Sequence, residues 1–280
     1  MNNPISHLQI QSSKPFLRWA GGKNWLLKRI EPIWPRLVFN NYHEPFLGAG
    51  SFFFFLNTST NSYLNDINEE LIKTFTCVKN DVDSVISELK KFENTKAFYY
   101  KIRNTTFDTD IQQAARFIYL NQTSYNGIYR VNLRGQYNVP YGNRSKNFLD
   151  IECLKSANRA LQIANLTSQD FYHCIDKVMS GDLVFLDPPY TISHNNNGFL
   201  KYNKKLFSLE DQYRLSAMID EIKKKDAFYI LTNAAHWKIK EIFDKNDNFT
   251  ELERASLVGG KHAKRTLYKE MLVSNIKMNF

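Results

Sequence analysis

The sequence reads Leu183-Val184-Phe185-Leu186-Asp187-Pro188-Pro189-Tyr190 at its most informative point. Four apolar residues closed by two prolines predict a buried strand that cannot continue. Such a strand delivers a carboxylate and an aromatic ring to its carboxyl end, which is where open α/β sheets bind their ligands. The segment therefore predicts an α/β fold with a site directly after this strand.

Asp187, Pro188, Pro189 and Tyr190 suit attack by a weak nitrogen nucleophile on an electrophilic methyl group. The lone pair of an exocyclic amine on a nucleobase is delocalised, so acceptors must hold its protons and turn the lone pair toward the electrophile. The Asp187 carboxylate and the Pro188 carbonyl are such acceptors, and the Tyr190 ring offers a face for a flipped base. Taken alone, the tetrapeptide is equally compatible with a strand followed by a proline turn.

A second motif reads Tyr42-His43-Glu44-Pro45-Phe46 and continues as Leu47-Gly48-Ala49-Gly50-Ser51. It predicts a strand, a glycine turn that lets the backbone approach a ligand, and a helix whose amino end favours polar groups. Asp66 lies 18 residues after the first of these glycines, a spacing typical of an acidic residue that reaches ribose hydroxyls. Phe53 replaces the third glycine of the dinucleotide fingerprint, which argues against a nicotinamide or flavin dinucleotide.

A third motif reads Trp19-Ala20-Gly21-Gly22-Lys23 and precedes a helical pattern. The pair of glycines and the lysine are typical of a phosphate-binding loop, but no glycine stands five residues before Gly22. Asn24 also replaces the Ser or Thr that would bind magnesium, so an ATPase is excluded. An aromatic ring, two permissive glycines and a cation remain, beside either the predicted nucleoside site or an ordinary surface turn.

With these three motifs in this order, the chain resembles the Dam-type (D12 class) DNA adenine-N6 methyltransferases over nearly all of its length. Two further motifs carry the resemblance, Asn65-Asp66 and Tyr125-Asn126-Gly127 with Asn138-Val139-Pro140. The resemblance implies a Rossmann-like, S-adenosylmethionine-dependent methyltransferase sheet that ends in an antiparallel strand. It also implies an inserted helical DNA-recognition domain that carries a β-hairpin.

The resemblance implies S-adenosyl-L-methionine as the cofactor and assigns residues to it. The residues expected at the cofactor are Trp19, Gly21, Gly22, Lys23, Glu44, Pro45, Phe46, Gly48, Gly50, Ser51, Asp66, Asp170 and Asp187. No metal is expected.

A differently composed insert separates the nucleotide motifs. Helical spacing of apolar residues predicts helices over 82–92, 97–103 and 110–121. The alternation and the glycine turn of residues 124–141 predict a β-hairpin. We therefore expect a catalytic, cofactor-binding domain from 1–68 and 153–280, and a target-recognition domain from 69–152.

A ribbon that carries arginine and amide side chains can enter a major groove, where arginine reads guanine and amides read adenine. The alternative is a hairpin that only caps the helices. By resemblance, Tyr125 wedges into the duplex and Ile128, Arg130 and Pro140 contact bases of a GATC site. Arg18 stands where close relatives carry a lysine that contacts a guanine of that site. The predicted DNA-binding residues are Arg18, Tyr125, Asn126, Ile128, Arg130, Asn138 and Pro140.

The remaining sequence predicts a scaffold and one polar loop. A helix is expected over 208–224, a strand over 228–232, a helix over 234–244 and strands over 251–257 and 266–275. Residues 191–207 are polar and basic, which predicts a lid or binding loop. His236 is expected to be solvated or to cap a helix rather than to act as a base.

Composition agrees with a polyanionic partner. The chain has 37 Lys and Arg against 28 Asp and Glu, a formal net charge of +9, which favours double-stranded DNA. Three separated cysteines, Cys77, Cys153 and Cys174, support neither a disulfide framework nor a zinc site. No leader and no apolar stretch long enough for a bilayer is evident, so we expect a cytoplasmic monomer without a membrane partner.

Three alternatives stay open at this point. Cytosine-N4 methylation uses the same acceptor geometry but usually places Ser ahead of the prolines. A binding protein could keep the fold without turnover, and RNA methylation is disfavoured because the major groove of A-form RNA is inaccessible to such a ribbon. The resemblance also leaves room for a cognate restriction endonuclease that acts separately on the same sites.

Overall fold

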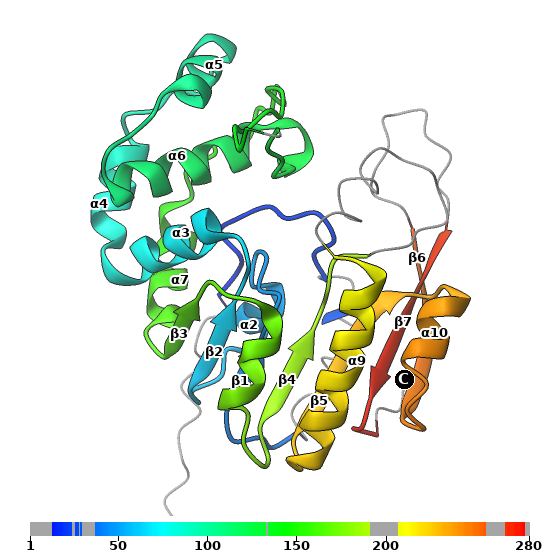
Figure 1. Cartoon of the computed structure of the whole chain (residues 1–280). Helices are drawn as coiled ribbons and strands as arrows, with labels where there is room; N and C mark the ends of the chain where they lie inside the picture. Colours follow the sequence, from blue (N-terminus) through cyan, green and yellow to red (C-terminus); the bar gives the residue numbers. More distant parts are fainter. Residues whose placement is uncertain are drawn as a thin grey trace, which may run out of the picture. The chain divides into compact units, whose positions relative to one another are not determined.

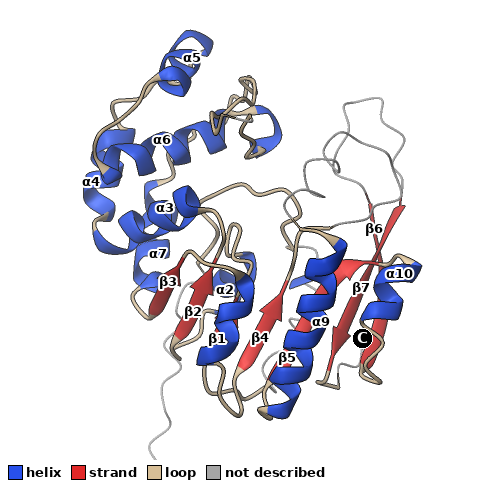
Figure 2. Cartoon of the chain, in the orientation of Figure 1, coloured by secondary structure: helices blue, strands red, loops and turns tan. Residues whose placement is uncertain are grey.

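The structure is a computed structural model that describes residues 13–23, 26–27, 29, 37–132, 134–190, 207–255 and 267–277 (Figures 1 and 2). The predicted polar loop 191–207 lies outside the described residues, apart from Phe207. None of the helices in the described part is both long and apolar enough to span a bilayer.

The chain forms two compact units. The first consists of Met1–Lys23, Gly48–Ser59 and Lys73–Ile163, and the second of Asn24–Leu47, Thr60–Ile72 and Ala164–Phe280. These bounds follow from packing. The predicted division into catalytic residues 1–68 and 153–280 and recognition residues 69–152 concerns function, and it stays a prediction.

The second unit contains, among its described residues, a seven-stranded sheet in the order β3-β2-β1-β4-β5-β7-β6. The strands are β1 (Tyr42–Glu44), β2 (Ser62–Asn65), β3 (Ala164–Thr167), β4 (Leu183–Leu186), β5 (Phe228–Ala234), β6 (Asn248–Ala255) and β7 (Leu267–Ser274). Strands β1 to β5 are parallel to one another, whereas β7 is antiparallel to both β5 and β6. The predicted methyltransferase-like sheet is confirmed, although its antiparallel strand lies inside the sheet and β6 forms the edge.

The core of the second unit explains its local structure. All four residues of β4 are buried, as expected for a central parallel strand that is covered on both faces. Helix α9 (Leu209–Lys224) lies across β4 and β5 (Figure 2). It buries Leu215, Met218, Ile219 and Ile222 at helical spacing. Ser208 and Asp211 form a capping box that fixes where the helix begins.

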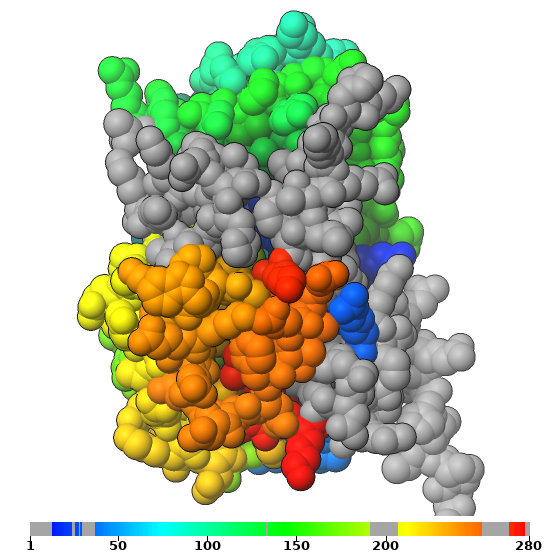
Figure 3. All heavy atoms as spheres, turned by 90° about the vertical axis from the view of Figure 1, so that its right-hand side faces the viewer, coloured from blue at the N-terminus to red at the C-terminus, as the bar shows by residue number. Residues whose placement is uncertain are grey.

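The described part of this unit also contains two shorter helical elements. The 3₁₀ helix η3 (Phe171–Lys177) follows β3, and α10 (Trp237–Ile242) follows β5. The space-filling view shows α10 and β6, in orange, on an outer face (Figure 3). His236 caps α10, because its Nδ1 accepts the N–H of Lys238 at 3.3 Å. The prediction that His236 is a capping residue is confirmed.

The first unit is mainly helical. The predicted helices are confirmed as α4 (Val82–Leu89), α5 (Lys96–Asn104) and α6 (Asp110–Thr123), and α2 (Ser51–Leu56) follows the glycine turn. Asp81, Thr95 and Thr109 cap α4, α5 and α6 with their side chains. The structure adds α7 (Ile151–Leu161), and α3 (Glu69–Asn80) continues from the second unit into the first.

The predicted hairpin 124–141 differs from a regular ribbon. It opens with the 3₁₀ turn η2 (Tyr125–Gly127), in which Asn126 has a φ of 54°. Its arms pair at two isolated antiparallel bridges, Ser124 with Tyr141 and Val131 with Tyr137, and its described residues form no regular strand. The two arms run antiparallel, with the N–H of Asn132 donating to the carbonyl of Gln136 and the N–H of Asn138 to the carbonyl of Arg130. They do not extend into regular strands, because Pro140 has no N–H to donate and the left-handed turn at Asn126 interrupts the extended backbone.

A buried hydrogen bond ties β1 to the residue before β4. His43 Nε2 lies 2.8 Å from Asp182 Oδ2, and both side chains are inaccessible to solvent. Asp182 also accepts from the main chain and side chain of Asn41 and from the N–H of Met179. Burial lowers the pKa of the His43 imidazole, although its hydrogen bond with Asp182 opposes the shift.

We predict that this histidine makes stability depend on pH. Because the folded-state pKa of His43 lies below the unfolded value, the unfolded chain binds the proton first, and stability falls as the pH drops below about 6.5. The slope that one such group adds is at most about 1.4 kcal/mol per pH unit. Denaturant unfolding between pH 7.5 and pH 5 measures it, with buffer pH as the varied condition.

Two variants separate this source from other groups. His43→Gln should flatten the acid limb, whereas His173→Gln, which removes an exposed histidine, should leave it unchanged. An unaltered slope in His43→Gln would show that other groups cause the acid sensitivity.

Candidate active site

The predicted catalytic tetrapeptide lies at the carboxyl end of β4, as expected. Pro188 is buried, and Asp187, Pro189 and Tyr190 are half-buried. Thr232 Oγ1, on the neighbouring strand β5, donates to Asp187 Oδ1 at 2.8 Å. The Tyr190 hydroxyl donates to Glu270 Oε2 on β7 at 2.7 Å. Both polar side chains of the tetrapeptide are therefore anchored by the next strands of the sheet.

The loops after β1, β2 and β3 are tied together by one amide. Asn65, which is 1% exposed, donates to the carbonyls of Pro45 at 3.2 Å and Gln169 at 3.0 Å. Its Oδ1 accepts the N–H of Gln169 at 3.1 Å. Asn65 thus aligns the chain segments that carry Pro45 and Phe46, Asp66 and Asp170, all beyond the carboxyl ends of parallel strands.

Asp170 is held by an arginine that the sequence did not reveal. Its carboxylate pairs with Arg214 on α9 through distances of 2.6 and 3.2 Å, and it accepts the N–H of Tyr172. Burial raises the pKa of Asp170, but the hydrogen bonds from Arg214 and Tyr172 outweigh it, so the pKa lies below its usual value. The Arg214 guanidinium also lies over the Phe171 ring, 4.9 Å from its centroid. Asp170 is consequently presented as an ionised acceptor of fixed orientation.

Glu44 ends β1 as a buried carboxylate. Its Oε2 accepts the hydroxyl of Tyr42 at 2.7 Å. Burial and the neighbouring Glu44 charge raise the pKa of Tyr42 well above its usual value. Tyr42 therefore stays a neutral donor that keeps Glu44 in place.

Two of the three sequence motifs meet within the first unit. A Cβ on Gly48, whose φ is +50°, would lie 2.8 Å from Trp19 Cδ1 and 2.9 Å from Trp19 Nε1. A Cβ on Gly22 would lie 3.6 Å from Ser51 Oγ. Lys23 is 3% exposed and donates from Nζ to the carbonyl of Gly21 at 2.9 Å. The Gly21–Lys23 turn and the Gly48–Ser51 turn thus form one cradle, which only a glycine at position 48 allows.

The predicted DNA-binding residues of the loop 124–141 are exposed or half-buried, and two buried tyrosines hold the loop in place. Tyr125 is 50% exposed, Asn126, Arg130 and Pro140 are exposed, and Ile128 and Asn138 are half-buried. Arg130 Nε donates to Asn138 Oδ1 at 2.7 Å. The buried Tyr137 and Tyr99 hold this loop by donating to the carbonyls of Ile128 and Val139.

Arg18 behaves differently from the other predicted DNA contacts. Its NH1 donates to the carbonyls of Gln122 at 3.4 Å and Ser124 at 3.2 Å. Its main chain exchanges two hydrogen bonds with the side chain of Asn121. Burial, followed by repulsion from Arg144, lowers the pKa of the Arg18 guanidinium. In this structure Arg18 supports the start of the loop 124–141, which we call the recognition loop after its predicted role, and the contact of Arg18 with DNA stays a prediction.

One aromatic stack joins a predicted cofactor residue to the recognition loop. The Trp19 indole stacks on Tyr129 with a centroid separation of 5.8 Å, and Tyr129 stacks on Phe117 of α6 at 5.2 Å. This stack could not be predicted from the sequence, because Tyr129 lies between the predicted DNA contacts Ile128 and Arg130 in the loop.

A family comparison identifies the chain. The family model of the D12 class N6 adenine-specific DNA methyltransferases matches residues 19–258. The chain belongs to this family.

Full-length relatives agree with the family. The type II methyltransferase M1.LlaDCHI of Lactococcus lactis subsp. cremoris is 33% identical over 274 residues, covering 94% of this chain and 95% of the relative. The type II methyltransferase M.MjaIII of Methanocaldococcus jannaschii is 36% identical over 244 residues, covering 79% and 84%. The DNA adenine methylase of Escherichia coli (strain K12) is 31% identical over 286 residues, covering 96% and 100%.

The family decides between the activities that the sequence left open. This chain is an adenine-N6 DNA methyltransferase, so cytosine-N4 methylation and a binding-only role are not retained.

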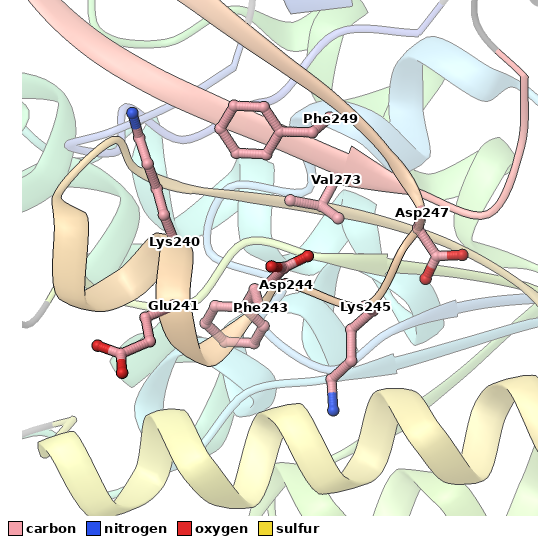
Figure 4. A pocket seen from close by; sticks show the side chains of 8 residues that line it. All are labelled: Lys240, Glu241, Phe243, Asp244, Lys245, Asp247, Phe249 and Val273. Atoms are coloured by element: carbon pink, nitrogen blue, oxygen red, sulfur yellow. The ribbon is translucent and has the colours of Figure 1, made fainter.

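A pocket elsewhere in the methyltransferase is unrelated to these residues. It lies among α10, the following turn, β6 and β7 (Figure 4). Its lining residues are Lys240, Glu241, Phe243, Asp244, Lys245, Asp247, Phe249 and Val273. None of them belongs to a predicted site. Lys245 pairs with Asp220, and Lys223 pairs with Asp247, at 2.7 Å each, so the charges here stabilise the scaffold.

We predict that Gly48→Ala displaces the Trp19 indole. An L residue at positive φ costs about 1–2 kcal/mol, and the added methyl group would also overlap the indole, which costs about 1–3 kcal/mol more. Gly135→Ala is the matched control, because Gly135 has a φ of +73° and a Cβ there would meet nothing within 4 Å. Equilibrium unfolding of both variants measures the difference, and equal losses of stability would show that the indole yields without cost.

Proposed function

We propose that this methyltransferase transfers the methyl group of S-adenosyl-L-methionine to N6 of an adenine flipped out of duplex DNA, within a GATC or closely related site. The observation that carries the proposal is the position of residues 187–190. They leave the fully buried strand β4 with the Asp187 and Tyr190 side chains each fixed by a hydrogen bond from or to a neighbouring strand.

The residues present fit this cofactor. The Gly48 cradle lets two backbone turns approach each other closely, and Asp66 and Asp170 place carboxylates after β2 and β3. Such acceptors suit ribose hydroxyls and an amino group. When bound, S-adenosyl-L-methionine supplies an electrophilic methyl group. We assign to it Trp19, Gly21, Gly22, Lys23, Glu44, Pro45, Phe46, Gly48, Gly50, Ser51, Asp66, Asp170 and Asp187.

The catalytic residues orient the nucleophile. Asp187 and the Pro188 carbonyl accept the protons of the adenine amine, and this turns its lone pair toward the electrophile. Pro188 and Pro189 fix the backbone that carries these acceptors, and Tyr190 stacks on the flipped base. The donor from Thr232 keeps the Asp187 carboxylate in one orientation, so reorganisation during the reaction is small. The amine proton becomes acidic after methylation and leaves to water.

Target recognition is assigned to residues 69–152. The exposed Tyr125 fills the space that the adenine vacates, and Arg130, with Asn138 as its partner, reads a base edge. Asn126, Ile128, Pro140 and Arg18 complete the contact set. The anchoring of this loop through Tyr99 and Tyr137 supports a reading role, because contacts held by rigid residues lose little entropy on binding.

The relatives named type II methyltransferases support a further partner. A cognate restriction endonuclease that acts separately on the same site would make this enzyme the protective half of a modification system. We propose a monomer that works in the cytoplasm, where its DNA substrate lies.

Sequencing that detects modified bases tests the proposed function. Applied to DNA from a methylation-free host that expresses the chain, it reports the modified base, its position and the target site together. Modified adenine confined to GATC supports the proposal, and modified adenine in a different site would overturn the specificity alone.

We predict that Asp187→Ala nearly abolishes transfer while DNA binding persists. Loss of one preorganised contact to the reacting group commonly costs about 100- to 1000-fold in rate. Single-turnover transfer of a labelled methyl group measures it. Asp176→Ala removes an exposed aspartate of the same unit and should turn over normally. A near-normal rate of transfer by Asp187→Ala would contradict the proposed role of Asp187.

We predict that Arg130→Ala relaxes specificity at one base pair. A bidentate base contact contributes about 1–3 kcal/mol of discrimination, whereas a phosphate contact weakens all sequences alike. Competition binding of GATC and singly mismatched duplexes distinguishes the two cases. Lys90→Ala, which removes an exposed cation of the same unit, should preserve the ratio. Equal losses on matched and mismatched duplexes for Arg130→Ala would demote Arg130 to a phosphate contact.

A further inference from the structure

The Tyr190 hydroxyl is held by a carboxylate on the antiparallel strand β7. It donates to Glu270 Oε2 at 2.7 Å. Glu270 is 2% exposed and is paired with Ala234 of β5 in the sheet register. A buried carboxylate on a central strand is uncommon unless it is hydrogen-bonded, because removing it from water is costly.

This contact restrains the side-chain torsions of Tyr190. The two prolines before it limit the main chain, but the ring can still turn about its two side-chain torsions. A hydrogen bond from the far end of the ring to a fixed carboxylate limits both torsions.

Two different strands of the sheet hold the first and the last residue of the tetrapeptide. Thr232 on β5 fixes Asp187 at 2.8 Å, and Glu270 on β7 fixes Tyr190. Because β5 and β7 are hydrogen-bonded neighbours, the acceptor for the amine and the stacking ring keep a constant spacing. The amine of the flipped adenine can reach Asp187 only if the base lies in one plane. The orientation of the Tyr190 ring sets that plane, because the base stacks on it.

We propose that Glu270 is a positioning residue, which fixes the Tyr190 ring in the plane against which the flipped adenine stacks. This inference rests on the proposed role of Tyr190 in base stacking. It gives β7 a part in catalysis, because Glu270 on this strand accepts the hydrogen bond of the Tyr190 hydroxyl.

A double-mutant cycle tests the inference. Glu270→Met removes the acceptor at similar volume and should lower kcat roughly tenfold, the equivalent of one lost hydrogen bond of about 1.4 kcal/mol. Glu270→Gln keeps an oxygen acceptor and should stay within about threefold of the parent, since a neutral acceptor is weaker. In a Tyr190→Phe background, which lacks the hydroxyl, Glu270→Met should cause no further loss. Full additivity of the two changes would overturn the inference.

A spectroscopic readout separates positioning from a merely structural role. The excited-state lifetime of 2-aminopurine, placed at the target adenine, shortens when the base stacks on an aromatic ring. The stacked component in the complex should decrease in Glu270→Met and Tyr190→Ala and be retained in Glu270→Gln. An unchanged lifetime distribution in Glu270→Met would contradict positioning.

The chain offers a matched control for the loss of a tyrosine–carboxylate contact. Tyr229 on β5 donates to Asp247 Oδ2, also at 2.7 Å, and neither residue is assigned to the site. Tyr229→Phe should change the unfolding free energy and leave kcat and the lifetimes unaltered.

If Glu270→Met fails to fold, as judged by circular dichroism, Glu270→Asp replaces it in the cycle, because it keeps a carboxylate and withdraws it by one methylene group. A parent enzyme that does not methylate adenine would refute the proposed function, whereas additivity in an active parent refutes only the role of Glu270.

Discussion

The complete burial of β4 is the constraint on which the rest of the structure depends. A strand that pairs on both edges with parallel neighbours must satisfy all of its backbone groups inside the sheet, and its four residues are all buried. The proline pair ends this pairing abruptly, because proline cannot donate to the ladder. Asp187 is therefore the first polar residue after β4, and it lies at the edge of the sheet where the parallel strands end.

Neighbouring strands then convert this position into a fixed orientation. Carboxylates and phenols rotate freely at the end of a strand unless another element holds them. Thr232 and Glu270 hold the tetrapeptide, Asn65 ties three strand-end loops together, and Arg214 holds Asp170. Each of these polar contacts fixes a buried or half-buried group in one orientation, and its loss would remove a hydrogen bond worth about 1 kcal/mol. The site is preorganised by the scaffold rather than by its own residues.

In the first unit, buried side chains fix the loop that we propose for DNA recognition in the same way. Buried tyrosines hold the carbonyls of a loop whose outer side chains stay exposed. A loop without regular strands can thus present arginine and amide groups at fixed positions, although its own backbone pairs at only two described bridges. The stack of Trp19 on Tyr129 adds a rigid link between a residue assigned to the cofactor and this loop.

The sequence by itself determined the elements with strong local signals. The buried strand before the proline pair, the glycine turn at Gly48 and Gly50, and the helices with clear apolar spacing were all predictable, because hydrophobic periodicity and the special torsions of Gly and Pro act locally. It also placed Asp187 and Tyr190 at a strand end and His236 at a helix cap.

Only the tertiary structure decided the partners. Thr232, Glu270 and Arg214 lie between 44 and 80 residues from the groups that they hold, and no local pattern marks them, since threonine, glutamate and arginine are ordinary residues of strands and helices. The order of the strands brings β7 beside β5 and so brings Glu270 to Tyr190. The same holds for the loop 124–141: Tyr99 of the distant helix α5 and Tyr137 of the loop itself donate to the carbonyls of Val139 and Ile128, and no local pattern predicts these partners.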